Sequence, residues 1–221
     1  MSGVTIAATR LSKSYVGAST VTAVVEASLE IQAGEVVLIS GPNGSGKTTL
    51  LAMLGGLLQP SSGTVTLDGK DIHALPPRSL PAFRLRHIGF VFQAFRLIEE
   101  LTARENVELV LEMAGAPDAA HRAAALLEEA GMTRRADRLA RNLSSGEKQC
   151  LAIARALAND PAVILADEPT GSLDSRAGEL AMRLLGAAAR TRGKAVVIVS
   201  HDPRIEKHAG RVLRMVDGRL C

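Results

Sequence analysis

The sequence is poor in aromatic and sulfur-containing residues: its 221 residues include no tryptophan, one tyrosine and two cysteines. Cys150 and Cys221 are too few for a disulfide framework or a cysteine-based metal site. Long apolar runs are also missing, because none reaches the roughly 18 residues needed to cross a bilayer. The first residues do not form the basic-then-apolar segment of a secretion signal. We therefore expect a soluble cytosolic protein with no direct membrane span, which would act at a membrane only through a partner.

The sequence also lacks a large excess of either positive or negative charge. The 26 basic residues are mixed with 23 acidic ones, for a net charge of +3. Nucleic-acid-binding proteins concentrate basic residues on one face, so this balance argues against a nucleic acid partner. Arginines gather in two stretches, 78–104 and 134–141, which either cover solvated helix faces or contact lipid headgroups or a partner. The length fits one domain, or one core with an inserted lobe.

Predicted buried strands and helices alternate along the chain, which is typical of an α/β protein with a parallel sheet. Short strands near the N-terminus predict an antiparallel β arm. From residue 94 to 142 the pattern is helical, with capping-box spacing at Thr102 and Glu105. We expect residues 94–142 to form an inserted helical lobe and residues 1–93 and 143–221 to form the core. The predicted elements are core strands at 36–40, 87–92, 162–166, 195–199 and 212–216, arm strands at 4–8, 28–31 and 64–67, and helices at 47–57, 144–158 and 175–192.

A glycine-rich loop follows the predicted strand at 36–40 and opens a helix. Its sequence fits the P-loop pattern of nucleotide-binding proteins, in which backbone N–H groups turn toward phosphate oxygens. Lys47 is expected to neutralise the β- and γ-phosphates, and the Thr48 hydroxyl is expected to ligate Mg²⁺. The loop residues expected to contact the nucleotide are Gly41, Pro42, Asn43, Gly44, Ser45, Gly46, Lys47, Thr48 and Thr49.

Polar side chains also follow three other predicted strands, where ligands of open α/β sheets bind. Asp167 is expected to hold Mg²⁺, and Glu168 is expected to polarise the attacking water. His201 is placed to donate to the γ-phosphate. Gln93 is placed to contact Mg²⁺ or water at the junction of core and lobe. The sequence therefore predicts ATP hydrolysis with Lys47, Gln93, Glu168 and His201 in catalysis and Thr48, Gln93 and Asp167 around the metal.

The most specific segment is Leu143-Ser144-Ser145-Gly146-Glu147-Lys148-Gln149, here called the signature segment. Together with the P-loop and the acidic pair, it makes the chain resemble the ATPase subunit of ABC transporters over nearly its whole length. The resemblance implies a P-loop NTPase (RecA-like) core with an N-terminal antiparallel β arm and an inserted α-helical lobe. It rests on Tyr15, residues 41–48, Gln93, residues 143–149, residues 162–168, Ser172-Leu173-Asp174 and His201.

The resemblance also implies a homodimer that closes around two ATP molecules. In such a dimer, Tyr15 stacks on adenine, and Ser144 and Gly146 reach the γ-phosphate of ATP bound to the opposite protomer. Asp174 would organise the dimer interface. Ser145 and Glu147 would lie at the nucleotide beside Ser144 and Gly146.

A narrower resemblance points to the lipoprotein-releasing, macrolide-exporting and glycolipid-exporting group and its cell-division relatives. It is carried by residues 89–95, 101–107 and 166–174, and it implies a separate integral membrane permease. The chain would then sit peripherally on the cytoplasmic side of the inner membrane and power export or extraction of a lipid, lipoprotein, peptide or drug. A regulatory ABC ATPase that controls cell-envelope or cell-division hydrolases without transport is the alternative.

Soluble ABC ATPases that act on DNA or ribosomes are a further class, but they usually need a long coiled coil or two ATPase halves in one chain.

Two positions depart from the family pattern. Ser145 stands where the family usually has Gly, and Cys150 stands where it usually has Arg. Either change slows hydrolysis or is neutral.

Overall fold

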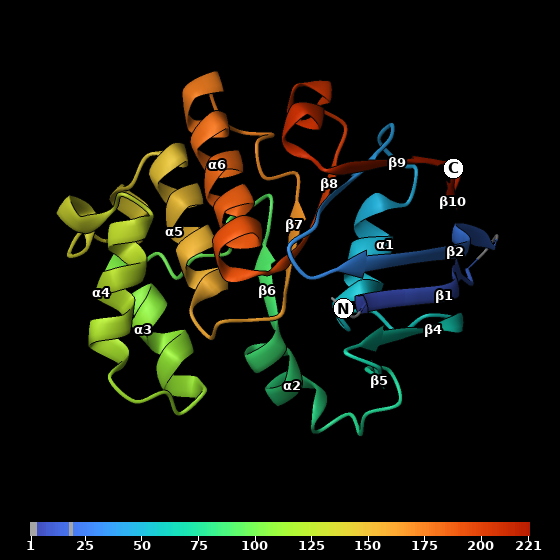
Figure 1. Cartoon of the computed structure of the whole chain (residues 1–221), viewed down its shortest axis with the longest axis horizontal. Helices are drawn as coiled ribbons and strands as arrows, with labels where there is room; N and C mark the ends of the chain where they lie inside the picture. Colours follow the sequence, from blue (N-terminus) through green and yellow to red (C-terminus); the bar gives the residue numbers. More distant parts are fainter. Residues whose placement is uncertain (1–3, 18–19) are drawn as a thin grey trace.

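The computed structural model describes residues 4–17 and 20–221. An antiparallel sheet forms an arm on one side of the molecule, with strand order β2-β1-β4-β5 (Figure 1). Its strands are β1 (Val4–Tyr15), β2 (Val21–Gln32), β4 (Ser62–Leu67) and β5 (Lys70–Asp71). This arrangement confirms the predicted N-terminal arm, although β1 and β2 are much longer than the segments predicted. The added length is held by pairing between the strands, which is interrupted by several register shifts.

The second sheet has the strand order β10-β9-β3-β8-β7-β6. All neighbouring pairs from β9 to β6 are parallel, and β10 is antiparallel to β9. Because parallel strands end at the same edge of a sheet, the residues that follow β3, β6, β7 and β8 come together there. The strands are β3 (Val36–Ser40), β6 (Ile88–Val91), β7 (Val163–Asp167), β8 (Ala195–Ser200), β9 (Arg211–Val216) and β10 (Arg219–Leu220).

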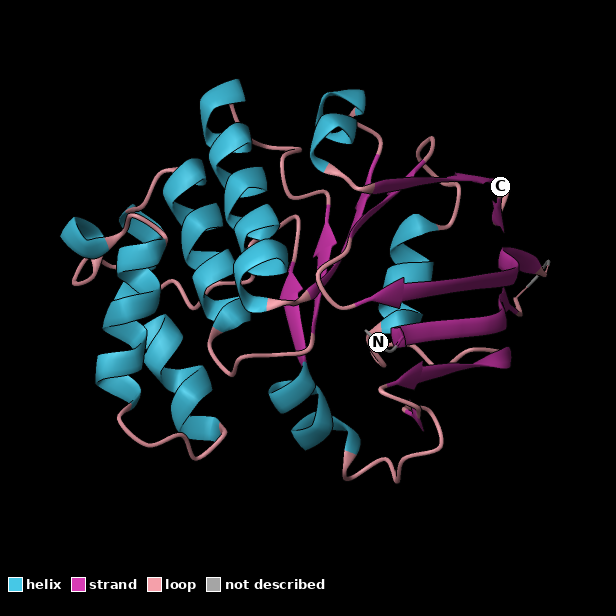
Figure 2. Ribbon diagram, in the orientation of Figure 1, coloured by secondary structure: helices cyan, strands magenta, loops and turns pink. Residues whose placement is uncertain are grey.

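Helices cover both faces of this sheet (Figure 2). Alternate strand residues pack into two separate cores: Leu38 and Ile198 on the side of α5 and α6, and Ile39 and Val199 on the side of α1 and the arm. Burial on both faces explains why these strands read as continuous apolar runs. The helices are α1 (Lys47–Leu54), α2 (Leu80–His87), α3 (Ala103–Met113), α4 (Ala119–Glu129), α5 (Ser145–Leu157) and α6 (Ser175–Arg192).

One helix was not predicted, and the end of another was predicted wrongly. Helix α2 has no counterpart among the predicted elements; its Pro81 falls within the first turn, where a missing N–H costs no helical hydrogen bond. Helix α1 ends at Leu54, not at residue 57, because Gly55 and Gly56 follow it, and Gly56 has a left-handed φ of 64°. Helix α6 has the predicted limits.

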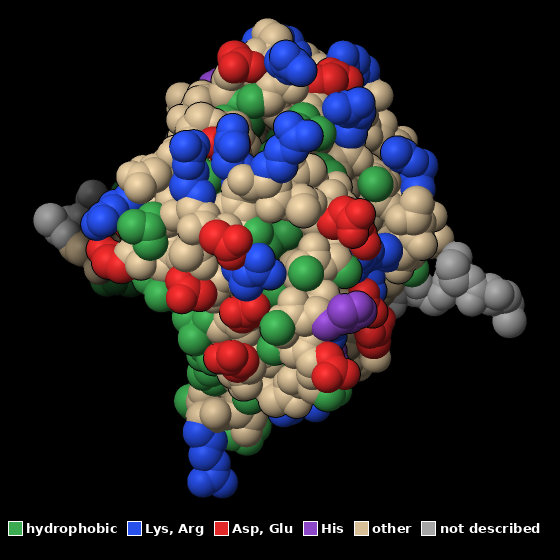
Figure 3. All heavy atoms as spheres, turned by 90° about the vertical axis from the view of Figure 1, so that its left-hand side faces the viewer, with side chains coloured by type: hydrophobic (Ala, Val, Ile, Leu, Met, Phe, Trp, Pro, Cys, Tyr) green, Lys and Arg blue, Asp and Glu red, His purple; other side chains and the backbone are tan. Residues whose placement is uncertain are grey.

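Helices α3 and α4 pack against each other and against α5 at the side opposite the arm. Seen from that side, basic side chains gather over the upper part of the surface and acidic ones over the lower part (Figure 3). The charge of this face is therefore divided between the two signs. In the described part of the chain, no helix is both long and apolar enough to span a membrane.

Candidate nucleotide site and signature surface

The P-loop (residues 41–48) forms the turn between β3 and α1 and can be built only with glycine at two points. A Cβ on Gly41 would meet the Met215 carbonyl oxygen at 2.1 Å, and one on Gly46 would meet the Ala23 carbonyl oxygen at 2.1 Å. Gly46 also has a φ of 101°, which side chains rarely adopt. The loop therefore approaches neighbouring backbone too closely for any larger residue, while its N–H groups stay at the N-terminus of α1.

A cavity of about 410 Å³ opens beside this loop and is called here the nucleotide cavity. Its walls come from the P-loop, the arm and the ends of three strands of the parallel sheet. It brings together nine of the nineteen residues predicted to bind or hydrolyse ATP or to hold its metal ion. Its lining is Ala23, Asn43, Gly44, Gly46, Lys47, Thr48, Thr49, Gln93, Glu168 and His201.

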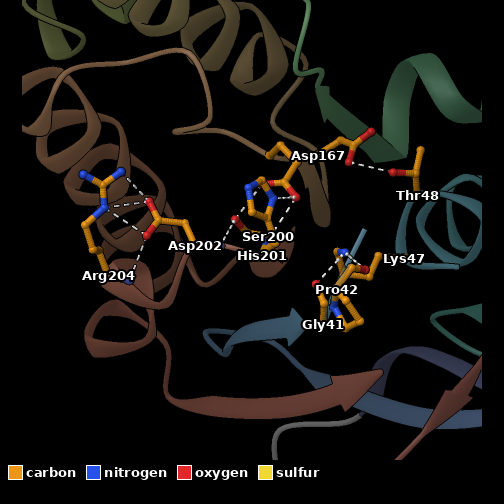
Figure 4. A network of polar contacts seen from close by, with 10 residues as sticks. Gly41, Pro42, Lys47, Thr48, Asp167, Ser200, His201, Asp202 and Arg204 are labelled. Atoms are coloured by element: carbon orange, nitrogen blue, oxygen red, sulfur yellow. Dashed lines mark hydrogen bonds and ion pairs between the residues drawn. The ribbon is translucent and has the colours of Figure 1, made fainter. Parts of the chain in front are cut away.

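Lys47 is the cation of this cavity, and only 6% of it is exposed. Its Nζ donates to the carbonyl oxygens of Gly41 and Pro42, each at 2.8 Å (Figure 4). A buried ammonium needs hydrogen-bond partners, and among the described residues it has no carboxylate partner within ion-pair distance. A site of this kind stabilises an added anion such as a phosphate. The neighbouring Ser45 hydroxyl is buried and has no partner among the described residues.

Two oxygen ligands for a hard cation lie side by side at the same edge. The Thr48 hydroxyl donates to Asp167 Oδ1 at 3.0 Å. Burial raises the pKa of Asp167, helped by the charge of Glu168 and opposed by the Thr48 hydrogen bond. A hydroxyl and a carboxylate fit Mg²⁺, which takes its remaining ligands from phosphates and water. No cluster of three or more His, Cys, Asp or Glu residues able to hold a metal occurs in the described part of the chain.

Both carboxylate oxygens of Glu168 are held by neighbouring residues. Its Oε2 accepts from the Ser200 hydroxyl at 2.7 Å, and its Oε1 accepts from His201 N at 3.1 Å and lies 2.7 Å from His201 Nδ1. Its backbone has a left-handed φ of 44°, a strained state that persists only where the surroundings enforce it. Glu168 follows the last residue of β7 and His201 follows the last residue of β8; Figure 4 shows His201 beside Ser200 and near Asp167. Sequence reasoning missed Ser200, although it ends a buried strand one residue before His201.

A second polar pair supports the turn after His201. Asp202 receives two hydrogen bonds from Arg204 Nε and one from Nη2, and its carboxylate also accepts from Arg204 N. These hydrogen bonds lower the pKa of Asp202. The pair was also missed from the sequence, where it reads as an ordinary surface ion pair.

Tyr15 does not line the nucleotide cavity. It lies at the end of β1 with 46% of its surface exposed, and the Lys13 ammonium stands 5.5 Å from its ring centroid. Stacking of Tyr15 on adenine stays a prediction.

The signature segment lies at the N-terminus of α5, on a different surface. Ser144 Oγ accepts from Glu147 N at 3.3 Å, and Glu147 Oε2 accepts from Ser144 N at 2.9 Å, so the two residues form a capping box. The other carboxylate oxygen of Glu147 accepts from Arg135 Nε at 2.6 Å, and this contact is the main reason that the pKa of Glu147 is lowered. Both oxygens of Glu147 thus accept hydrogen bonds within the chain, and its place at the nucleotide stays a prediction.

A cavity of about 780 Å³, the signature cavity, joins this segment to the start of α6. Ser144, Gly146, Glu147 and Asp174 line it, and it shares no lining residue with the nucleotide cavity. Asp174 caps α6 by accepting from Ala177 N at 2.8 Å. Ser144 and Ser145 are exposed at the surface. The structure therefore assembles the predicted site residues into two separate groups.

Cys150 lies below this surface. It is 4% exposed, and burial raises the pKa of its thiol to about 11. The position where the family usually has Arg is thus occupied by a neutral side chain in the core.

A P-loop, a strand-end carboxylate pair and a separate capped signature helix define a P-loop ATPase. The sequence pattern of the ABC transporter family matches residues 24–171, and the chain belongs to this family. It is 47% identical over 194 residues to the lipoprotein-releasing system ATP-binding protein LolD of Bacteroides fragilis, covering 87% of this chain and 90% of LolD.

Two further comparisons support membership in the ABC transporter family. The macrolide export ATP-binding/permease protein MacB of Salmonella typhimurium is 44% identical over 213 residues, which cover 95% of this chain but 33% of MacB. The ATP-binding cassette MJ0796, solved as a dimer in a post-hydrolysis state with ADP and Pi, has a TM-score of 0.90 and 40% identity, with 97% of this chain and 96% of that one covered. The predicted fold class, ATPase activity and relationship to this group are confirmed.

Proposed function

We propose that this chain closes as a homodimer around two ATP molecules and thereby powers a separate integral membrane permease. The observation that carries the proposal is the separation of the two cavities. Ser144 and Lys47 line different surfaces of one chain, so both can contact one nucleotide only if they come from two copies. The dimeric state of MJ0796 supports the same arrangement.

Each side of the shared site has a distinct part. In the nucleotide cavity, Lys47 and the P-loop N–H groups bind the β- and γ-phosphates, and Thr48, Asp167 and Gln93 hold the Mg²⁺ that neutralises them. From the partner copy, the Ser144 hydroxyl and the positive N-terminus of α5 approach the γ-phosphate. The Ser144 hydroxyl can turn its proton outward while its oxygen still caps the helix.

Glu168 is the group placed to polarise the attacking water. Each carboxylate oxygen accepts more than one hydrogen bond, so the contacts with Ser200 and His201 leave room for a water molecule. In its imidazolium form, His201 donates from both nitrogens: Nδ1 to Glu168 and Nε2 to the γ-phosphate. Loss of the γ-phosphate then removes a contact from Lys47, Ser144 and His201 together, and this loss favours reopening of the dimer.

A groove between α2, α3 and α5 supports a membrane partner. It encloses about 420 Å³ and is lined mainly by apolar side chains, among them Leu57 and Met113, which are 47% and 67% exposed. Helix α2 beside it carries Arg84, Arg86 and His87 and no acidic residue. These features fit an amphipathic helix of the permease with an apolar face and acidic residues. The chain would then lie peripherally on the cytoplasmic side of the inner membrane.

The names of the relatives suggest the class of substrate. LolD is called a lipoprotein-releasing ATP-binding protein, and MacB combines an ATP-binding region with a permease for macrolide export. We propose export or extraction of a lipid, lipoprotein, peptide or drug. We also propose that residues 94–142 move as a lobe relative to the core when the dimer closes.

Capture of the permease tests this function. Glu168→Gln, loaded with ATP, should hold the closed dimer and recover a multi-spanning membrane protein from detergent-solubilised membranes. Lys47→Ala is the matched control that cannot bind nucleotide, and Met113→Glu should lose the membrane protein while keeping ATPase activity. Recovery of no membrane protein, or of the same proteins with Lys47→Ala, would contradict the proposal. Co-recovery of an envelope hydrolase without any transport activity would favour the regulatory alternative.

A further inference from the structure

Arg155, near the C-terminal end of α5, holds the loop that follows Gln93. Its Nη1 donates to the Arg96 carbonyl oxygen at 2.6 Å and its Nη2 donates to the Phe95 carbonyl oxygen at 2.9 Å. Burial lowers the pKa of Arg155, and no carboxylate in the described part of the chain lies within ion-pair distance of it. A desolvated cation that donates to two carbonyl groups indicates that Arg155 holds these groups in place.

The two residues that Arg155 holds are both in the left-handed region of the backbone. Phe95 has a φ of 56° and Arg96 a φ of 52°. This conformation is strained for a residue other than glycine. Because the two strained residues come two and three positions after Gln93, release of their carbonyl groups would let this loop relax and carry Gln93 with it.

The turn that follows α5 binds the neighbouring helices. Asn159, four residues after Arg155, donates from Nδ2 to the carbonyl oxygens of Leu85 in α2 at 3.0 Å and Val110 in α3 at 3.1 Å. Arg155 and Asn159 both line the groove described above. An occupant of the groove would therefore touch the side chain that holds the Gln93 loop.

We propose that Arg155 is a positioning residue that keeps Gln93 in the nucleotide cavity and links it to the groove and to the signature segment. Helix α5 has 13 residues and is about 20 Å long at 1.5 Å per residue. Ser144 caps its first turn, and Arg155 lies in its last. A partner that shifts α5 through the groove would thus move Gln93 in one copy of the site and Ser144 in the opposite copy together. The inference rests on the proposed role of Gln93.

Basal ATPase kinetics of the purified chain test the inference without the permease. Arg155→Met removes both hydrogen bonds, and we expect kcat to fall at least about tenfold, with the Kd for ATP within about twofold of wild type. Arg122→Met is the matched control, because Arg122 Nη2 also donates to a backbone carbonyl of this region, that of Ala158 at 2.9 Å. It should leave kcat within about twofold.

A rescue experiment separates positioning from general stability. Glycine adopts a left-handed φ without cost, so Phe95→Gly with Arg96→Gly should restore at least about a third of kcat in the Arg155→Met background. The inference is overturned if Arg155→Met keeps kcat, if both arginine variants lose kcat in proportion to their Tm, or if the glycine pair restores nothing.

Gln93→Ala in the same assay distinguishes the two possible failures. If Gln93→Ala lowers kcat and Arg155→Met does not, Arg155 is not the positioning residue and the role of Gln93 stands. If Gln93→Ala leaves kcat unchanged, the proposed role of Gln93 is wrong and the inference falls with it.

Discussion

Ser144→Ala and Thr102→Ala remove the same structural feature at two helices, but in the proposed dimer only the helix capped by Ser144 faces the nucleotide of a second copy. Ser144 caps α5 and Thr102 caps α3, each with a complete capping box. Thr102 lines neither the nucleotide cavity nor the signature cavity. The pair therefore separates the cost of losing a helix cap from the cost of losing a contact with ATP.

The expected magnitudes differ between stability and rate. Loss of a Ser or Thr cap costs about 1 kcal/mol, which lowers Tm by roughly 2–4 °C in a chain of this size. Ser144→Ala would also remove the proposed hydrogen bond from the Ser144 hydroxyl to the charged γ-phosphate. A hydrogen bond of this kind is worth about 1.5–3 kcal/mol. At about 1.4 kcal/mol per factor of ten, this loss lowers the ATPase rate by about ten- to a hundredfold.

Differential scanning calorimetry and steady-state ATPase assays at the same temperature measure both quantities. Both variants should show similar small drops in Tm, but only Ser144→Ala should lose ATPase activity. Equal rates for the two variants would refute the assignment of Ser144 to the shared site. So would an ATPase loss in Thr102→Ala as large as that in Ser144→Ala.

Three further predictions concern single side chains. Lys47→Ala removes the buried ammonium of the nucleotide cavity, so calorimetric titration should detect no ATP binding; unchanged affinity would reject this role. With the pKa of Cys150 at about 11, about one Cys150 thiol in a thousand is ionised at pH 8. Iodoacetamide should therefore label the exposed Cys221 in the native protein and spare the buried Cys150. Equal labelling of the two cysteines by mass spectrometry would contradict this. Arg135 lowers the pKa of Glu147 in the folded protein. The contribution of Glu147 to folding stability is therefore complete above its pKa in the unfolded chain and is lost as the pH falls through its pKa in the folded protein. The Tm difference between wild type and Glu147→Gln should shrink on acidification, and a constant difference would argue against this contribution.

Local sequence signals predicted the parts of the fold that short segments determine. Helix α6 was predicted with its correct limits because Asp174 caps its start and Gly193, with a left-handed φ of 63°, ends it. The P-loop and both capping boxes are likewise encoded in a few adjacent residues. These signals place Lys47 and Ser144 without knowledge of the tertiary structure.

Contacts between distant segments could not be predicted in this way. Arg155 and the loop at 95–96 are about sixty positions apart, and no local sequence pattern at either place predicts that they are in contact. The contact of Glu147 with Arg135, twelve positions away, has no local sequence signal either. The length of β1 and the start of α2 also depend on pairing and packing that local propensity does not contain.

The central claim is that two copies of the chain enclose ATP between the P-loop of one and the signature segment of the other. Light scattering of Glu168→Gln with saturating ATP tests it most directly, with the double variant Glu168→Gln/Ser144→Ala as the comparison. The account predicts a particle of twice the 23.2 kDa of one chain for Glu168→Gln and a single chain for the double variant, although both bind ATP. A single chain for both variants with ATP bound, or equally stable dimers for both, would contradict it.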